Sequence, residues 1–276
     1  MNTLAWILGS SLLGGTLSVA AAALMAVKAR ASAVPILVSY SVGALLGATF
    51  LGVLPHAMEH MAQPARLGAS VLAGLLVFFV LEKLVLWRHH HAPQWGEQAQ
   101  AQEHDGAPPV DAHRHPHGYG HTHGHDHGRS GALIMIGDTV HNFVDGTLIA
   151  AAFLADLHLG IVTALAILAH EIPSEVSDFL ILLHSGYSRR QALLINLMSS
   201  LAMVVGGIVG YLAFASLNTW IPDLLGFVAA SMIYVAVADL IPGLHRRVDL
   251  RATIQQVLLI GLGIFTIWLV RSFIAH

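Results

Sequence analysis

Eight stretches of this chain are predicted to cross a lipid bilayer as helices. A crossing needs about 20 mainly apolar residues, because each residue of an α-helix adds about 1.5 Å of length. The predicted spans are residues 3–27, 36–58, 67–88, 131–156, 159–184, 191–215, 222–243 and 252–274. Only 11% of the 276 residues are charged, against about 25% in soluble domains. The sequence therefore predicts an integral membrane protein in the lipid bilayer, with an all-α fold and one eight-helix bundle.

The composition excludes several other classes of protein. The chain contains no cysteine, so it has neither a disulfide framework nor a thiolate metal site. Its net charge of -3 predicts no nucleic-acid partner. The apolar N-terminal run lacks a basic flank and a clear cleavage site, so we expect it to be the first span rather than a signal peptide.

The positions of the basic residues predict how the spans are oriented. Ten of the 13 Lys and Arg residues lie in or beside the first, third, fifth and seventh loops. Basic residues stay preferentially on the cytosolic side of a membrane, so these loops are expected in the cytosol and both termini outside. The compact, cysteine-free, Ala- and Gly-rich chain favours a bacterial inner membrane as its location.

One long polar segment interrupts the apolar pattern. Spans 1–3 lie within residues 1–88 and spans 4–8 within residues 131–276, while residues 89–130 are rich in His, Gly, Pro and Gln. Such a composition buries too little apolar surface to fold, so a disordered cytosolic loop is predicted. Its eleven His residues favour loose metal binding for buffering or sensing, with a dispensable linker as the alternative.

The fourth span carries polar residues at helical spacing. Within the sequence GDTVHNFVDG, the residues Asp138, His141, Asn142 and Asp145 occur at i, i+3, i+4 and i+7. Residues with this spacing share one face of a helix. We therefore expect one polar strip along an otherwise apolar helix.

The fifth span carries a matching strip in the sequence HEIPSEVSDF. His170, Ser174 and Asp178 recur every four residues, and Glu171, Glu175 and Asp178 form the adjacent row. Ionisable groups inside a membrane are costly, and they usually mark an ion or substrate path. This concentration of them favours a functional site, although a static polar network joining two helices is the alternative.

The two strips are expected to meet near the middle of the bilayer. A short turn at residues 156–160 joins the two spans, so they should be antiparallel neighbours. Imidazole nitrogens and carboxylate oxygens bind Zn²⁺ and also suit Fe²⁺ and Mn²⁺. Pro173 removes the helical partner of the Ala169 carbonyl, and a freed carbonyl is tolerated where it lines a cavity or binds an ion. A bound dication would offset the cost of burying the carboxylates.

These motifs resemble the paired signatures HNFxDG and HExPHE of one subgroup of the ZIP (Zrt/Irt-like) family of metal transporters. The chain has HNFVDG at 141–146 and HEIPSE at 170–175, with further matches in GVLPHA (52–57), FVLEKLVL (79–86) and IYVAVADLIP (233–242). The resemblance covers nearly all eight spans. It implies a homodimer that moves divalent cations, zinc foremost, into the cytoplasm, with an inverted repeat relating spans 1–3 to spans 6–8. It implies a transported ion rather than a cofactor, and no enzymatic activity.

The resemblance also assigns metal ligands by motif position. His141, Asp145 and His170 would bind one metal. Asn142, Asp145 and Glu171 would bind a neighbouring second metal, with Asp145 as the bridging carboxylate. The number of metals stays open, because the chain departs from the subgroup at the next ligand.

That departure is Ser174, where the subgroup has His. Serine is a poor zinc ligand, so either Glu175 or water replaces it, or the first site is weaker than usual. By the same resemblance Asp239 belongs to the exit path, with Asp138 and His245 as possible helpers.

A second polar group lies near the outer end of span 2. His56, Glu59 and His60 occur at i, i+3 and i+4. They would either gather cations at the entrance or form an ordinary interfacial polar cap. The sequence does not decide between these two interpretations.

Several other functions compete with zinc import. A transporter mainly for iron, manganese or cadmium, a metal exporter, and a non-transporting metal sensor all remain open. An intramembrane metalloprotease fits poorly, since the HExxH motif would need His at Ser174 and an unbroken helix at Pro173.

Overall fold

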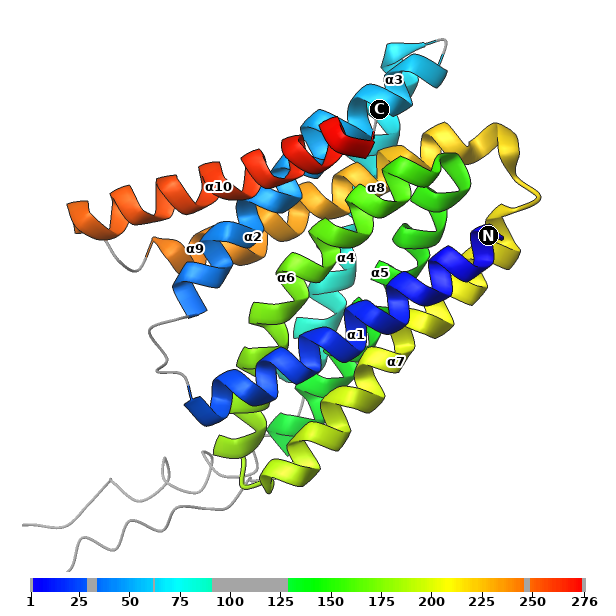
Figure 1. Ribbon diagram of the computed structural model, residues 1–276. Coiled ribbons are helices and arrows are strands. Elements are labelled where there is room, and N and C mark those ends of the chain that lie inside the picture. Colours follow the sequence, from blue (N-terminus) through cyan, green and yellow to red (C-terminus); the bar gives the residue numbers. More distant parts are fainter. Residues whose placement is uncertain (1, 29–33, 62, 91–128, 246–248, 275–276) are drawn as a thin grey trace, which may run out of the picture.

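The computed structural model describes residues 2–28, 34–61, 63–90, 129–245 and 249–274, and these are helical with no strand (Figure 1). In chain order the helices and helical turns are α1 (Thr3–Lys28), α2 (Val34–Ala48), η2 (Thr49–Val53), α3 (Leu54–His60), α4 (Pro64–His90), α5 (Arg129–Ala155), α6 (Leu157–His184), α7 (Arg189–Phe214), η3 (Asn218–Trp220), α8 (Ile221–Tyr234), η4 (Val235–Leu240), α9 (Ile241–Leu244) and α10 (Leu250–Ile274).

Each predicted span corresponds to a helical segment whose ends lie within three residues of the prediction. Seven of these segments are long and apolar enough to cross a membrane, which supports an integral membrane protein. The remaining segment is α5, which is 27 residues long but carries the polar strip with Asp138 and Asp145. Most of the predicted polar loop lies outside the described residues, so its disorder and its metal binding stay predictions.

Two of the apolar segments are interrupted in the same way. Between α2 and α3 lies the π-helical turn η2, and between α8 and α9 lies the π-helical turn η4. Pro55 and Pro242 follow these turns, and a proline ring clashes with the carbonyl four residues earlier in a regular helix. The wider π turn relieves that clash without ending the helical segment. Spans 2 and 7 therefore share one local design.

Glycine allows α5 to lie directly against α7. A Cβ atom on Gly146 would lie 1.9 Å from the carbonyl oxygen of Met203, and one on Gly206 would lie 1.9 Å from that of Phe143. No larger residue fits at either place, because real Cβ contacts do not approach so closely. This close packing holds the polar strip of α5 at a fixed depth in the bundle.

Candidate metal site

A single residue separates the two helices that carry the polar strips. α5 ends at Ala155 and α6 begins at Leu157, so Asp156 alone forms the connection. Its side chain accepts a hydrogen bond from the backbone N–H of Leu159 at 2.9 Å, which caps the first turn of α6. The turn is shorter than predicted, and it brings α5 and α6 together as expected.

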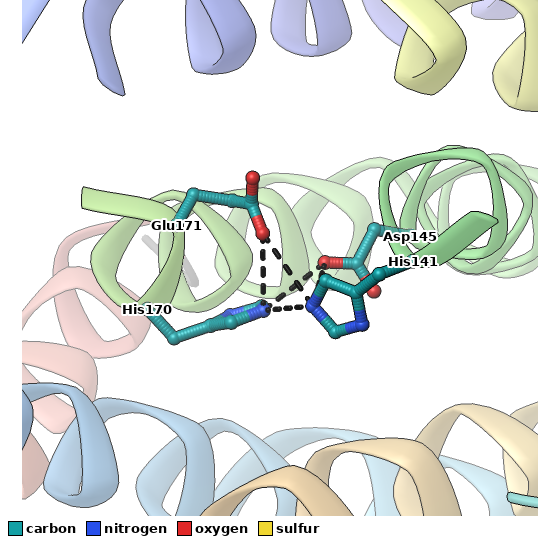
Figure 2. Close-up of side chains that lie close together, drawn as sticks. All are labelled: His141, Asp145, His170 and Glu171. Atoms are coloured by element: carbon teal, nitrogen blue, oxygen red, sulfur yellow. Dashed lines mark hydrogen bonds and ion pairs between the residues drawn. The ribbon is translucent and has the colours of Figure 1, made fainter. Parts of the chain in front are cut away.

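Four side chains from these helices converge on one point (Figure 2). His141 and Asp145 come from α5, and His170 and Glu171 come from α6. The Nε2 atom of His170 lies 3.2 Å from Nε2 of His141, 3.1 Å from Oδ2 of Asp145 and 3.4 Å from Oε1 of Glu171. The Nε2 atom of His141 lies 3.5 Å from the same Glu171 oxygen and 3.8 Å from Asp145 Oδ2.

These separations match the edges of a metal coordination shell. An ion bound tetrahedrally at about 2.0–2.1 Å from each ligand atom holds those atoms about 3.3 Å apart. Two nitrogens and two carboxylate oxygens form a ligand set that suits Zn²⁺ and other borderline dications. The cluster can therefore accept such an ion with little rearrangement.

The buried acceptors around the cluster lack protein donors. Asp145 Oδ2 and both carboxylate oxygens of Glu171 are buried and have no hydrogen-bond partner among the described residues. Asp145 Oδ2 approaches His170, but the contact is not aligned as a hydrogen bond. Buried carboxylates without donors are strongly unfavourable unless a cation compensates them. The site thus has a shortage of positive charge that a dication would supply.

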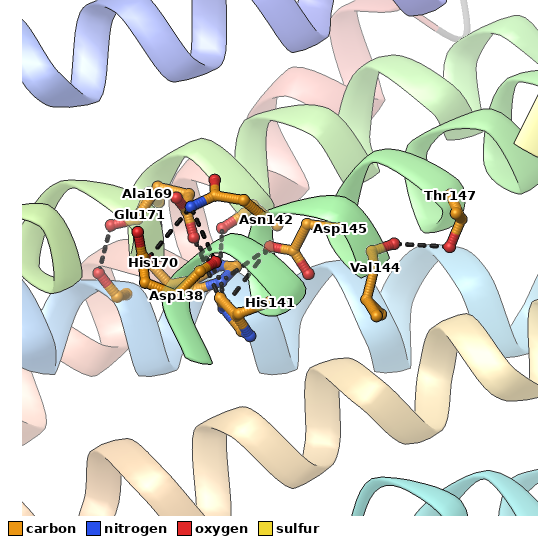
Figure 3. A network of polar contacts seen from close by, with 11 residues as sticks. Asp138, His141, Asn142, Val144, Asp145, Thr147, Ala169, His170 and Glu171 are labelled. Carbon is orange, nitrogen blue, oxygen red and sulfur yellow. Dashed lines mark hydrogen bonds and ion pairs between the residues drawn. The ribbon is translucent and has the colours of Figure 1, made fainter. Parts of the chain in front are cut away.

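Asn142 and Asp138 lie beside the cluster and interact with each other (Figure 3). The Asn142 side-chain amide donates to Asp138 Oδ1 at 3.1 Å and to the Asp138 carbonyl at 3.2 Å. Its own Oδ1 is buried and has no hydrogen-bond partner in the part of the chain that the structure describes. The Ser199 hydroxyl, from α7, donates to Asp138 Oδ2. The resemblance placed Asn142 and Glu171 on a second metal, but the structure groups Glu171 with the first set of ligands.

The other predicted acidic ligands on α6, Glu175 and Asp178, lie outside the four-residue cluster. Ser174 is half-buried and follows His170 by one helical turn. Glu175 is fully buried, with neither side-chain oxygen paired to a described donor, although its carbonyl accepts from the Asn196 amide at 3.1 Å. Asp178 is nearly buried and lies within interaction range of Asp138. Replacement of the missing ligand by Glu175 remains a prediction.

Pro173 leaves α6 continuous, and the carbonyl that it frees has a partner. α6 runs as one helix from Leu157 to His184 with the proline inside it. The Ser41 hydroxyl, from α2, lies 2.5 Å from the Ala169 carbonyl oxygen and donates to it. This carbonyl was expected to line a cavity or bind an ion, but in the structure it anchors α2 to α6 one residue before His170.

One side chain of the cluster also lines a cavity between three helices. The side chain of His141 is 33% exposed and lines a cavity of about 350 Å³ between α4, α5 and α8. Asp239 and Glu82 line the same cavity, and the hydroxyl of Tyr234 donates to Glu82 at its wall. Asp239, the predicted exit residue, is therefore connected to the cluster through open space.

The opposite end is closed by packed side chains. A smaller cavity of about 180 Å³ lies at the other end of α6, lined in part by Gly52, Leu159 and Val162. Along α6 between this cavity and His170 lie Ala166 and Ile167, which are buried in the apolar core. The two cavities are thus separated by an apolar layer.

Sequence reasoning missed three residues that support the site. They are Ser41 on α2, Asn196 on α7 and Ser199 on α7. The available signal was their position, since polar residues in the middle of an apolar span need a partner. Their partners lie on other helices, so the sequence alone could not identify them.

Comparison with known proteins identifies the family of this chain. The family model described as "ZIP Zinc transporter" matches residues 3–271. Zinc transporter ZIP13 of Homo sapiens is 31% identical over 266 residues, covering 86% of this chain and 71% of that protein. Zinc transporter zipt-7.2 of Caenorhabditis elegans is 29% identical over 274 residues, covering 86% of this chain but only 58% of the nematode protein. Because the family model spans nearly the whole chain, this integral membrane protein belongs to the ZIP zinc transporter family.

Proposed function

We propose that this protein carries Zn²⁺ into the cytoplasm through the cluster of His141, Asp145, His170 and Glu171. Members of its family are transporters rather than enzymes, and zinc is their substrate. The main support is that four ligand atoms from two helices lie within 4.8 Å of one another. The carboxylate oxygens among them have no hydrogen-bond partner among the described residues. A dication bound there would satisfy groups that no described protein donor satisfies.

The positions of the two ends of the described chain support an even number of membrane crossings. α1 begins and α10 ends at the same end of the bundle (Figure 1). An even number of crossings is needed for this arrangement, while seven segments are apolar enough by themselves. We therefore assign α5 as the eighth crossing, made possible by its packing against α6 and α7.

The distribution of basic residues supports one orientation of the chain in the membrane, and with it inward transport. With the odd-numbered loops in the cytosol, the cavity at Asp239 faces the cytoplasm and the closed end faces outward. Zinc would shed water onto the two imidazoles and two carboxylates, and neutralise them. The helices would then rearrange so that the ion leaves past Asp239, and the His-rich loop would receive it.

Position 174 contributes no ligand in this proposal. The four-residue cluster already supplies the usual coordination number of zinc. Glu175 adds negative charge close by without touching the ion, and Asn142 with Asp138 and Asp178 offers oxygen atoms for a second, weaker ion. Iron, manganese or cadmium as main substrate, and outward transport, are alternatives that the test below separates.

Three further features belong to the same proposal. The motifs HNFVDG and HEIPSE favour the subgroup with HNFxDG and HExPHE, and the matching π turns of η2 and η4 support an inverted repeat of spans 1–3 and 6–8. A homodimer is expected from the family. The bacterial inner membrane fits the composition.

The test is uptake of radiolabelled zinc into proteoliposomes that contain the purified chain. Unlabelled zinc, manganese, iron and cadmium serve as competitors, and a zinc gradient is imposed first inward and then outward. The absence of native cysteine allows one introduced thiol to report which way each molecule is inserted. Saturable uptake in the predicted direction, with zinc the strongest competitor, supports the proposal. Transport only in the other direction, or no transport of any dication, contradicts it.

A further inference from the structure

The outer end of the second apolar segment carries another group of metal-ligating side chains. His56, Glu59 and His60 lie on α3, and one ligand atom from each falls within 4.8 Å of the others. We propose that this group is a second binding site for a divalent transition metal, which captures the ion at the closed end of the bundle. The site goes beyond the transport function proposed above and does not depend on it.

The spacing on α3 suits metal binding on a single helix face. Two His residues at i and i+4 point the same way from successive turns, as they do in helical zinc motifs. The rings of His56 and His60 are stacked, with centroids 4.3 Å apart. Glu59 lies between them in sequence and adds a carboxylate oxygen, so the set is two nitrogens and one oxygen. A bound ion would keep open positions for water.

A backbone contact orients one of the rings as a metal ligand. The Nδ1–H of His60 donates to the carbonyl oxygen of His56 at 2.9 Å, which leaves Nε2 free. Metal-bound His residues usually donate their other ring N–H in this way. His170 shows the same pattern in the buried cluster, where its Nδ1 lies 3.4 Å from the Ala166 carbonyl and its Nε2 faces the other ligands.

The cavity next to α3 gives the site its place on the path. His56 lines the cavity of about 180 Å³ at the outer end of α6, together with Asp156 and His158. Arg271 also lines it, and its positive charge offsets the negative charge of Asp156. A three-ligand, water-accessible site beside a cation should bind metal weakly enough to release it. This combination suits capture and onward passage rather than storage.

An ordinary polar cap does not explain this arrangement as well. Side chains that only meet water at a membrane surface gain nothing from converging on one point. Here three ligands converge, one ring is oriented by the backbone, and His56 lines a cavity beside the first turns of α6. These observations favour a cation site over a cap.

The test measures metal binding at α3 by distance-dependent quenching of fluorescence. Ala65→Cys provides a unique thiol for a fluorophore on the exposed first turn of α4. Ala65 is five positions after His60, so the label attaches at most about 18 Å away. Co²⁺ is the quenching probe, Zn²⁺ is the competitor, and the full chain also carries His170→Ala to disable the buried cluster.

We expect saturable quenching by Co²⁺ that Zn²⁺ reverses. His56→Ala and His60→Ala should each weaken Co²⁺ binding by about tenfold or more, and Glu59→Gln by less, since losing a ligand costs more than losing its charge. Met58→Ala, on the same exposed turn but without a ligand, should leave the curve unchanged. Quenching that is unsaturable, or equal in His60→Ala, overturns the inference. Because the assay needs no transport, its failure is distinct from a failure of zinc uptake.

Discussion

The protein holds two groups of metal ligands that differ in burial more than in chemistry. Both combine two imidazoles with carboxylate. In the cluster between α5 and α6, His170 is 3% exposed and Glu171 is fully buried, whereas Glu59 and His60 on α3 are exposed. Water can solvate the exposed group when no metal is present. It cannot reach the buried oxygens, which therefore depend on a cation or on protonation.

This difference predicts different consequences for similar substitutions. Removing a buried ligand should abolish binding and leave the other charges unbalanced. Removing an exposed ligand should change affinity and little else. The following experiments use this contrast, in order of decreasing expected effect.

The largest effect is expected for His170→Ala. His170 makes the closest contacts of the cluster, with Asp145 and with His141, so its loss should lower zinc uptake by about a hundredfold or more. The measurement is the initial rate of radiolabelled zinc uptake into proteoliposomes. The matched control is His184→Ala, the same substitution at the exposed end of α6. Equal uptake by native protein and His170→Ala would refute the assignment of this site.

Acid should weaken transport by about tenfold between about pH 7.5 and about pH 5.5. A proton on the Nε2 atom of His141 or His170 occupies the lone pair that the metal needs, so lower pH means weaker binding. The measurement is the zinc concentration for half-maximal uptake, with the same pH on both sides of the membrane.

The double variant His56→Ala, His60→Ala sharpens this comparison. If the buried imidazoles carry the effect, the variant should keep the same dependence on pH. Loss of the pH dependence in the variant would show that His56 and His60 on α3 cause it. A rise of native uptake in acid would contradict proton competition altogether.

Ser174→His should make the site more selective. Ser174 follows His170 by one turn and is half-buried, so an imidazole there adds a nitrogen ligand that zinc prefers over manganese. We expect the preference for zinc over manganese in competition uptake to increase by about fivefold. Ser174→Ala is the control, and its preference should equal that of the native protein. An unchanged preference in Ser174→His would mean that position 174 does not face the ion.

The smallest effect is on stability. Replacing a buried charge by an apolar residue of similar volume is often favourable, so Glu175→Met should raise the unfolding free energy of metal-free protein by about 1 kcal/mol. The measurement is denaturant unfolding in detergent with a chelator present. Glu59→Met, at the exposed position, should change it by less than about 0.5 kcal/mol. Destabilisation by Glu175→Met would contradict this expectation. Complete loss of zinc uptake in Glu175→Met would instead indicate that Glu175 is a ligand.

The sequence predicted the helical segments well because the signal is local. Length and apolar content alone located each segment, and the spacing of His141 and Asp145 placed both on one face of α5. The adjacency of α5 and α6 followed from the short connection at Asp156. These predictions needed no knowledge of how distant helices pack.

The contacts that support the site could not be predicted, because they join helices that are distant in the sequence. Ser41 meets Ala169, and Ser199 meets Asp138, across helices that are far apart in sequence. Which acidic residue joins the cluster also depends on helix rotation. The resemblance assigned Glu171 to a second metal and left Glu175 as a replacement for position 174, whereas in the structure Glu171 lies with the other three ligands. Pairing of helices in space is a property of packing that spacing along one helix does not contain.

The single-residue connection at Asp156 also bears on how the chain enters the membrane during synthesis. α5 is not among the segments that are apolar enough to insert alone, since aspartate near the middle of a helix strongly disfavours transfer into lipid. α6 follows immediately, with Asp156 as the only residue between them. The two helices should therefore enter the bilayer together as a hairpin, with the polar faces sheltered against each other from the start. The pair that would bind the transported ion is thus expected to be assembled before α7 arrives to pack against it.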